Sequence, residues 1–196
     1  MFSGIVKALE KPVKILRSKY SLELVFPVPN KWRVEKGDSI AIDGICSTIT
    51  QTDGKTFSVF YMAETLRKTT LTFLPDGHMF NLEQPLRLND FVGGHLTSGH
   101  IDTVGNIESI EKDGQASVIV IGLPFSFTRY IIYKGSIAVN GVSLTVVSVA
   151  NTSFTVSLIP HTLRYTNLGL LLEKDSVNLE VDLFAKYLEK LQKSKA

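Results

Sequence analysis

The sequence contains one cysteine and no long apolar run, and each of these features narrows what the protein can be. Cys46 has no second cysteine with which to form an internal disulfide, so the chain suits a reducing compartment and is expected in the cytoplasm. A run of about 18 apolar residues, as a membrane-spanning helix requires, does not occur. The N-terminal "MFSGIVKALEKPV" has no basic segment followed by an apolar core, so no signal peptide is expected.

The sequence also lacks an excess of charge and the common cofactor motifs. Its 21 basic and 19 acidic residues give a net charge of +2, which does not indicate a nucleic-acid or membrane partner. No phosphate-binding loop, dinucleotide fingerprint or Ser-His-Asp order is present. The one basic cluster is a short C-terminal tail containing Lys186, Lys190, Lys193 and Lys195.

The sequence contains an internal repeat, in which the second half resembles the first. A shift of 97 positions aligns its two halves without a gap over much of their length. Three blocks keep this offset: "SIAIDGICST" with "SIAVNGVSLT", "FSVFYMAETLRKTTL" with "FTVSLIPHTLRYTNL", and "NLEQPL" with "NLEVDL". The period is far longer than the roughly 20–50 residues of a solenoid repeat, so the pattern indicates a duplicated domain. The glycines of "DFVGGH" favour a joint near Asp90–Gly94.

Each half has the pattern of a β domain. Short segments rich in Val, Ile, Phe and Thr alternate with turn signals such as "TDGK" and "EKDG". Several short strands in a domain of this size predict a small closed or partly open barrel. "PFSFTRYIIYKG" is compatible with a short helix before Lys134.

The C-terminus departs from the repeat and predicts an amphipathic helix. In "DLFAKYLEKLQKSKA" the apolar residues recur at intervals of three and four, with lysines on the other side. Such a helix can pack on its own chain or on copies of itself, and we favour self-association.

Cys46 and its repeat counterpart Ser143 are the first candidates for chemistry. A free cysteine is most often a small buried apolar residue, and periodicity alone favours that interpretation. The repeat argues for a slot that requires a small hydrogen-bonding side chain, because Ser143 occupies the same position. Thr48 and Thr145, two residues further on, fall on the same strand face.

Histidines at the joint and paired threonines are further candidates. His95 and His100 lie in "GGHLTSGHID", where they are either structural or able to move protons in a cleft between domains. A zinc site is not expected, because no thiolate lies nearby. Thr65 and Thr162 are taken to end strands, either as plain β formers or as matched ligand contacts in two copies of one pocket.

With these residues noted, the chain resembles the riboflavin synthase family of the alpha-chain type. The segments that carry the resemblance run from end to end in order: "MFSGIV", "GDSIAIDGIC", "MAETLR", "GGHLTSGHID", "KGSIAVNGVSLTV", "LIPHTLRYTNLG" and "VNLEVDLFAKYLE".

The resemblance implies a fold, a set of domains and an assembly. The fold is all-β with a C-terminal helix and consists of two tandem, similar six-stranded Greek-key β-barrels. Residues 1–92 and 93–181 would form the two lumazine-binding barrels, and 182–196 an oligomerisation helix. The assembly would be a homotrimer, with the active site between the N-terminal barrel of one subunit and the C-terminal barrel of the next.

The resemblance also implies a reaction. Such an enzyme is a transferase that moves a four-carbon unit between two molecules of 6,7-dimethyl-8-ribityllumazine. The products are riboflavin and 5-amino-6-ribitylaminopyrimidinedione, and neither metal nor organic cofactor takes part. The alternative is a non-catalytic relative that only binds lumazine or flavin. An oligonucleotide-binding barrel fits poorly, because a basic, aromatic groove is missing from the sequence.

The residues that match the family's functional positions fall into two groups. The catalytic candidates are Cys46, Ser39, His100, Phe2 and Asp182. The substrate-binding candidates are Gly4, Ile5, Val6, Cys46, Ser47, Thr48, Phe60, Tyr61, Met62, Ala63, Glu64, Thr65, Gly99, His100, Ile101, Lys134, Ser143, Leu144, Thr145, Leu158, Ile159, Pro160, His161, Thr162 and Leu163.

The first repeat departs from the family pattern "NGVCLTV" at two positions. Asp43 replaces the asparagine, and Ser47 replaces the leucine. Both replacements are expected to change the polarity of the first pocket.

Overall fold

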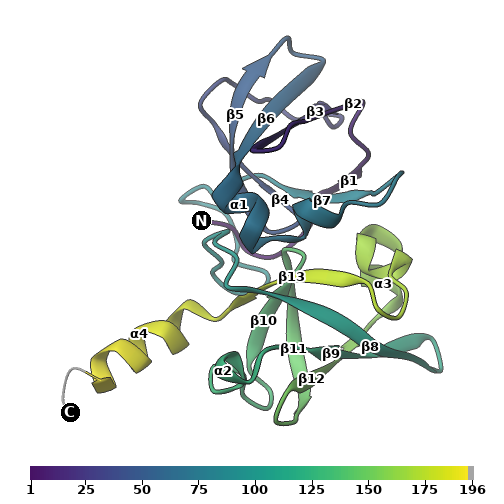
Figure 1. Ribbon diagram of the computed structural model, residues 1–196, viewed down its shortest axis with the longest axis vertical. Helices are drawn as coiled ribbons and strands as arrows, with labels where there is room; N and C mark the ends of the chain where they lie inside the picture. Colours follow the sequence, from purple (N-terminus) through teal and green to yellow (C-terminus); the bar gives the residue numbers. More distant parts are fainter. Residues whose placement is uncertain (194–196) are drawn as a thin grey trace.

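A computed structural model describes residues 1–193 and shows two β units, one above the other, with a helix at the C-terminus (Figure 1). The predicted all-β duplication and the C-terminal helix are thereby confirmed. Residues 194–196, the end of the predicted helical segment and the site of Lys195, lie outside the described residues. Within the described part of the chain, no helix is long and apolar enough to cross a membrane.

The N-terminal unit is a curled seven-stranded sheet with the order β1-β7-β4-β5-β6-β3-β2. A short α-helix and a 3₁₀-helix follow β6. The elements are β1 (Ala8–Glu10), β2 (Lys14–Arg17), β3 (Ser21–Pro27), β4 (Ser39–Ile42), β5 (Ile45–Thr52), β6 (Thr56–Met62), α1 (Ala63–Lys68), η1 (Thr70–Phe73) and β7 (Phe80–Glu83).

The C-terminal unit is a closed barrel with the order β10-β11-β12-β9-β8-β13, in which β13 pairs with β10. The expected short helix before Lys134 is present as α2. The elements are β8 (Thr103–Asp113), β9 (Ala116–Gly122), α2 (Phe125–Thr128), β10 (Ser136–Val139), β11 (Val142–Val149), β12 (Ser153–Leu158), α3 (Pro160–Tyr165), η2 (Asn167–Leu170), β13 (Ser176–Val181) and α4 (Leu183–Lys193).

The two units differ in how the sheet closes. In the C-terminal unit, one continuous strand, β8, pairs with β13 at its start and with β9 along the rest. In the N-terminal unit the same role is divided, because β1 pairs with β7 and β2 pairs with β3. The break falls at Lys11–Val13, where Pro12 has no N–H to donate to a ladder. The first sheet is therefore curled and split where the second is a closed barrel.

Alternating side chains form a separate apolar core inside each unit. Leu22, Leu24 and Phe26 of β3 are fully buried, while the residues between them are partly exposed. Phe154 and Val156 of β12 have the same role in the second core. The outer faces of the hairpins are therefore free to carry polar residues.

The segment that leads into each unit packs against the other unit. Ser143 N donates to Gly4 O at 2.8 Å, and Cys46 N donates to Gly99 O at 2.8 Å. The side chain of Val6 packs on the C-terminal core, and that of Ile101 packs on the N-terminal core. The segment that leads into each unit therefore covers the outer face of a β-hairpin in the other unit: β10–β11 in one case and β4–β5 in the other.

Buried glutamates hold these two leading segments in place. Glu83 accepts hydrogen bonds from Ser3 N, Ser3 Oγ and Gly4 N, at 2.7, 2.7 and 3.1 Å. Its repeat counterpart Glu180 accepts them from Ser98 N, Ser98 Oγ and Gly99 N, at 2.6, 2.7 and 3.0 Å. Burial raises the pKa of the Glu83 carboxyl, and the Ser3 and Gly4 bonds oppose that shift.

A buried polar network joins the two units about an approximate two-fold axis. Asp43 Oδ1 accepts from Asn81 N at 2.8 Å, and Asn140 Oδ1 accepts from Asn178 N at 2.8 Å. The side-chain amides of Asn81 and Asn178 cross to donate to the backbone carbonyls of Asn140 and Asp43, at 2.9 and 3.0 Å. Each amide thus binds the turn of the other unit, which aligns the two units.

Candidate functional site

Cys46 lies on the outer face of the hairpin formed by β4 and β5. Ile45, Ser47 and Ile49 point into the barrel and are buried, whereas Cys46 is half-buried and Thr48 is exposed. On β4, Ala41 pairs with Cys46 and Ser39 pairs with Thr48. This strand pairing places Ser39, Cys46 and Thr48 on one face.

A cavity of about 180 Å³ brings several candidate residues together beside the Cys46 side chain. It lies between this hairpin, the helix α1 and the segment that leads into the C-terminal unit. Its lining residues are Ile45, Cys46, Glu64, Thr65, Lys68, Thr69, Gly99, His100 and Ile101.

Gly99 is the residue that allows this close approach. Its φ of +82° lies in the left-handed region, and a Cβ added there would stand 2.6 Å from Cys46 Cβ. The backbone N–H of His100 donates to Ser98 Oγ at 3.2 Å, while the imidazole itself is exposed beside the cavity. An imidazole and a thiol therefore meet at one opening, although they are 54 positions apart in the sequence.

The C-terminal counterpart is covered where the Cys46 cavity is open. Ser143 Oγ and His95 Nδ1 share a hydrogen bond of 2.7 Å, and a Cβ added at Gly94 would stand 2.8 Å from the same hydroxyl. His95 Nε2 is buried and has no hydrogen-bond partner among the described residues. Burial lowers the pKa of His95, although Asp182 and Glu180 act in the opposite direction. The joint between the units thus supplies an imidazole to the second hairpin.

The remaining catalytic candidates lie around these two hairpins. Phe2 is 1% exposed and forms an antiparallel bridge with Thr97. Ser39 lines a separate cavity of about 220 Å³ with residues that include Arg33 and Arg87. Asp182 accepts from Phe184 N at 2.9 Å, at the start of α4.

The substrate-binding candidates divide between the cavity, the outer surface and the interior. Ser47 points inward, where its hydroxyl shares a 2.7 Å hydrogen bond with Tyr61 and donates to Ile45 O at 3.0 Å. Burial raises the pKa of Tyr61 beyond its usual range. The remaining candidates lie in the interior (Leu144, Leu158), on exposed or half-buried surface (Ile5, Val6, Phe60, Met62, Ala63, Lys134, Thr145, Ile159, Pro160, His161, Leu163), or beside the Ser143 hairpin (Gly4).

Two sequence-based expectations need correction. Thr65 and Thr162 do not end strands, because they lie in the helices α1 and α3. Asp43 does not line the first pocket, because it is 0% exposed in the network between the units. The ligand contact of Ser47 stays a prediction, and its side chain points inward in this structure.

Two polar cavity residues, Lys68 and Thr69, were missed by sequence reasoning. Lys68 Nζ forms an ion pair with Glu64 Oε1 at 2.9 Å, one helical turn away. Helical spacing from Glu64 would have pointed to Lys68, had the segment been recognised as a helix.

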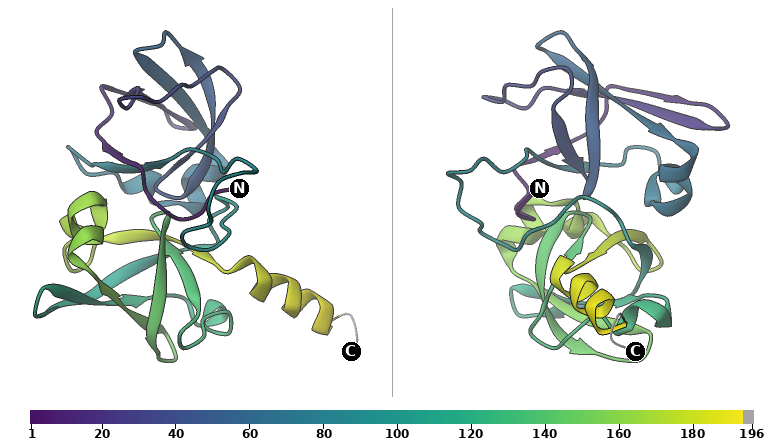
Figure 2. Two further views of the ribbon diagram at one scale, coloured as in Figure 1. Left: turned by 180° about the vertical axis from the view of Figure 1, so that it is seen from behind. Right: turned by 90° about the vertical axis from the view of Figure 1, so that its left-hand side faces the viewer.

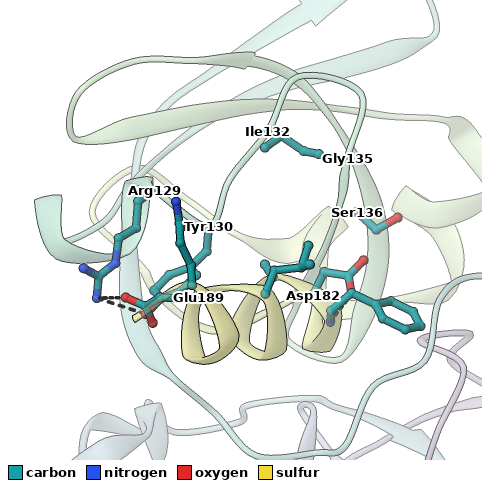
Figure 3. Close-up of a pocket in the computed structure, with 11 residues that line it drawn as sticks. Arg129, Tyr130, Ile132, Gly135, Ser136, Asp182 and Glu189 are labelled. Atoms are coloured by element: carbon teal, nitrogen blue, oxygen red, sulfur yellow. Dashed lines mark hydrogen bonds and ion pairs between the residues drawn. The ribbon is translucent and has the colours of Figure 1, made fainter. Parts of the chain in front are cut away.

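The helix α4 forms a second, larger cavity of about 370 Å³ with the C-terminal unit. Figure 3 shows Glu189 of α4 beside Arg129 and Tyr130, and Arg129 Nη2 lies 2.8 Å from Glu189 Oε1. The Tyr130 hydroxyl donates to the other oxygen of Glu189. Ser136 and Asp182 line the same cavity. These contacts anchor one side of the helix.

The apolar side chains of α4 are largely exposed, although Phe184 and Leu188 also line this open cavity. Phe184, Tyr187, Leu188 and Leu191 are between 63% and 67% exposed. Figure 1 and the left view of Figure 2 show the helix extending away from the C-terminal unit. Soluble monomers rarely expose a continuous apolar face of this kind, so the face is a candidate for contact with another chain.

Comparison with known proteins identifies the family of both halves. The lumazine binding domain family matches residues 3–85 and 98–182. The riboflavin synthase of Actinobacillus pleuropneumoniae is 38% identical over 96% of this chain and 88% of its own length. The riboflavin synthase of Bacillus subtilis is 35% identical over the same shares of the two chains.

Solved structures with the same fold are more distant in sequence. The crystal structure of LumP complexed with riboflavin has a TM-score of 0.85 at 23% identity, and covers 92% of this chain and 99% of that one. The complex of LumP with 6,7-dimethyl-8-(1'-D-ribityl) lumazine has a TM-score of 0.82 with the same coverage. At this identity the likeness shows the fold alone. From the match of both halves and the two synthase relatives, the chain belongs to the riboflavin synthase family and carries two lumazine-binding repeats.

Proposed function

We propose that this chain converts two molecules of 6,7-dimethyl-8-ribityllumazine into riboflavin and 5-amino-6-ribitylaminopyrimidinedione. The observation that carries this proposal is the cavity that contains both Cys46 and His100, on one of two related hairpins. A four-carbon unit passes between two identical molecules, so no external oxidant or carbon donor is needed. Relatives named riboflavin synthase support the same conclusion.

A duplicated fold suits this reaction because the two reactants are the same molecule. Two related sites can hold both in register, and positioning alone can supply much of the rate enhancement. The lumazine 7-methyl group is acidic, since its anion delocalises into the ring. The chemistry then needs proton transfer, addition to the second ring, carbon–carbon bond formation and elimination.

We assign roles within this scheme to three residues around the β4–β5 hairpin. His100 transfers protons or positions the ligand, because its imidazole is exposed at the cavity. Cys46 acts as a nucleophile or as a polar contact to the ring. Ser39, on the same face, orients the ring or a water molecule.

We further propose a homotrimer in which the N-terminal unit of one subunit faces the C-terminal unit of the next. Domains 1–92 and 93–181 would each bind one lumazine, and the segment 182–196 would hold the subunits together. The exposed apolar face of α4 supports this arrangement. The single cysteine favours a reducing cytoplasm as the place of the reaction.

The experiment that tests the function is incubation with 6,7-dimethyl-8-ribityllumazine while riboflavin absorbance and fluorescence are followed. We expect one riboflavin for every two lumazine molecules consumed. Tight binding without turnover would instead identify a carrier that only holds lumazine or flavin. The presence of Cys46 and His100 at one cavity favours the enzyme, since a carrier needs no proton carrier.

Deletion of the chain after Leu183 is expected to convert the oligomer to monomers, because it removes the apolar face of α4. Sedimentation velocity measures the change directly. The variant Lys193→Gln is the control, since it keeps both the apolar face and the contacts of Glu189 with Arg129 and Tyr130, and it should leave the oligomer intact. A truncated chain that still sediments as a trimer would refute the role of the helix.

A further inference from the structure

The cavity beside Cys46 is lined by a lysine that is not repeated at the matching position of the second unit. Lys68 lines this cavity together with Cys46 and His100. The repeat places Tyr165 at the matching position, and His161 at the position of Glu64. The His161 and Tyr165 rings lie 4.7 Å apart, where the first unit has an ion pair.

The helix α1 carries a net positive charge beside this opening. Glu64 pairs with Lys68 at 2.9 Å and with Arg67 at 2.5 Å, so two cations share one carboxylate. The hydrogen bonds from Lys68 and Arg67 lower the pKa of Glu64, which keeps it ionised near neutral pH. The three residues together therefore carry one excess positive charge.

The stability of the fold does not require two cations, Arg67 and Lys68, beside the one carboxylate of Glu64. All three side chains are 60% or more exposed, and surface pairs one helical turn apart contribute only a few tenths of a kcal/mol. Of the two cations, only Lys68 is part of the cavity lining, while Arg67 is not. Lys68 is therefore placed to act on whatever occupies the cavity.

We propose that Lys68 is a further substrate-binding residue that favours the deprotonated form of the lumazine held in the N-terminal unit. This inference rests on the proposed function, which supplies the ligand. Deprotonation breaks a C–H bond of the 7-methyl group; the proton passes to a base and the electron pair delocalises into the ring. A cation near that ring stabilises the anion, and the second unit offers aromatic rings instead. The two identical substrates are thereby made different.

Other ionisable groups around Lys68 do not supply this charge. Cys46 and His100 share the cavity, and burial holds Tyr61 neutral by raising its pKa. Of the strands and the 3₁₀-helix against α1, β3 carries Glu23 and η1 carries no ionisable side chain. Within the cavity lining, Lys68 is the one lysine or arginine.

The test compares the pH profile of kcat/KM in three variants of the full chain. In Lys68→Met the acid limb should move up by about half to one pH unit, which lowers kcat/KM about threefold to tenfold below the limb. Activity should recover at high pH, where the lumazine ionises without help. Lys68→Arg should restore the wild-type profile. Arg67→Met is the matched control, because it removes a cation from the same carboxylate without touching the cavity, and its limb should move less than half as far.

The outcomes separate this inference from the function on which it rests. A uniform loss at every pH in Lys68→Met, or equal shifts in Lys68→Met and Arg67→Met, would overturn the assignment of Lys68. If the wild-type chain binds the lumazine but does not turn it over, the proposed function fails. The ionisation of bound lumazine, followed by its absorbance across pH, then tests Lys68 by itself. An identical titration in wild type and Lys68→Met would refute it.

Discussion

Cys46→Ala is expected to lower the turnover of 6,7-dimethyl-8-ribityllumazine by about a hundredfold, while Ser143→Ala lowers it by less than about tenfold. The reason is the asymmetry of the two hairpins. Cys46 lies beside an open cavity with His100, whereas the Ser143 hydroxyl is already engaged by His95 at 2.7 Å. Steady-state formation of riboflavin, followed by absorbance, measures both losses.

Cys46→Ser is the matched control, because it gives the first hairpin the side chain of the second. An activity close to that of wild type would assign the position to a polar contact, and a loss as large as that of Cys46→Ala would assign it to thiol chemistry. Circular dichroism should show unchanged folding in all three variants, since both side chains lie on an outer hairpin face. Equal losses of turnover in Cys46→Ala and Ser143→Ala would contradict the proposal that the two hairpins have different roles in the reaction.

His78→Ala is expected to lower the free energy of unfolding by about 3 kcal/mol, because it leaves a buried carboxyl oxygen without its hydrogen-bond partner. Asp43 is 0% exposed, and its Oδ2 lies 2.7 Å from His78 Nε2. The same carboxylate accepts from Asn81 N and from Asn167 Nδ2, at 2.8 Å each. Loss of the imidazole therefore weakens the network that joins the two units. Urea unfolding followed by fluorescence measures the change.

The control is His78→Ala in the Asp43→Asn background, where no carboxyl group is left without its partner. There the loss should fall to about 1 kcal/mol, mainly the ring contact with Phe80 at 4.4 Å between centroids. Asn140 already occupies the matching position in the second unit and satisfies the same backbone N–H. A loss of the same size in both backgrounds would show that His78 stabilises by packing alone.

The pH dependence of Asp43→Asn follows from the direction of the Asp43 shift. Burial raises the pKa of this carboxyl above its ordinary value of 3.8, against the opposing effects of His78, Asn81 and Asn167. A raised folded-state pKa contributes stability that is fully present below the unfolded value and is lost as pH rises through the folded value. Asp43→Asn should therefore be more stable than wild type at neutral pH, by about 1 kcal/mol or more. The advantage should vanish near pH 4, and an advantage that grows on acidification would reverse the assignment.

The repeat made much of the fold readable from the sequence. Blocks at one fixed offset predicted two similar β units, and the spacing of Leu183, Phe184, Tyr187, Leu188 and Leu191 predicted α4. The same offset matched Cys46 with Ser143 on corresponding hairpins. Periods of two and of three to four residues are local properties of strands and helices, so they can be read without knowledge of distant contacts.

The sequence also indicated which side chains of a strand point into the core and which point outward. The alternation of Ile45, Ser47 and Ile49 already places Ser47 on the inner face, opposite Cys46 and Thr48. Its inclusion among the ligand contacts came from the family resemblance and not from the strand pattern. The helices α1 and α3 were missed because each is only six residues long, which is too short for a helical period to stand out from the preceding strand.

The sequence by itself determined the duplicated β architecture, the terminal helix and the paired positions of Cys46 and Ser143. Only the tertiary structure decided that the segment leading into each unit packs on the other unit. Gly99 and His100 therefore lie beside the Cys46 hairpin, while His95 covers Ser143. The tertiary structure also decided that Asp43 pairs with His78 between the units and that Lys68 faces the cavity. The physical reason is that such contacts depend on which surfaces pack together. Packing is set by the shape and burial of residues far apart in the chain, and local periodicity carries no record of it.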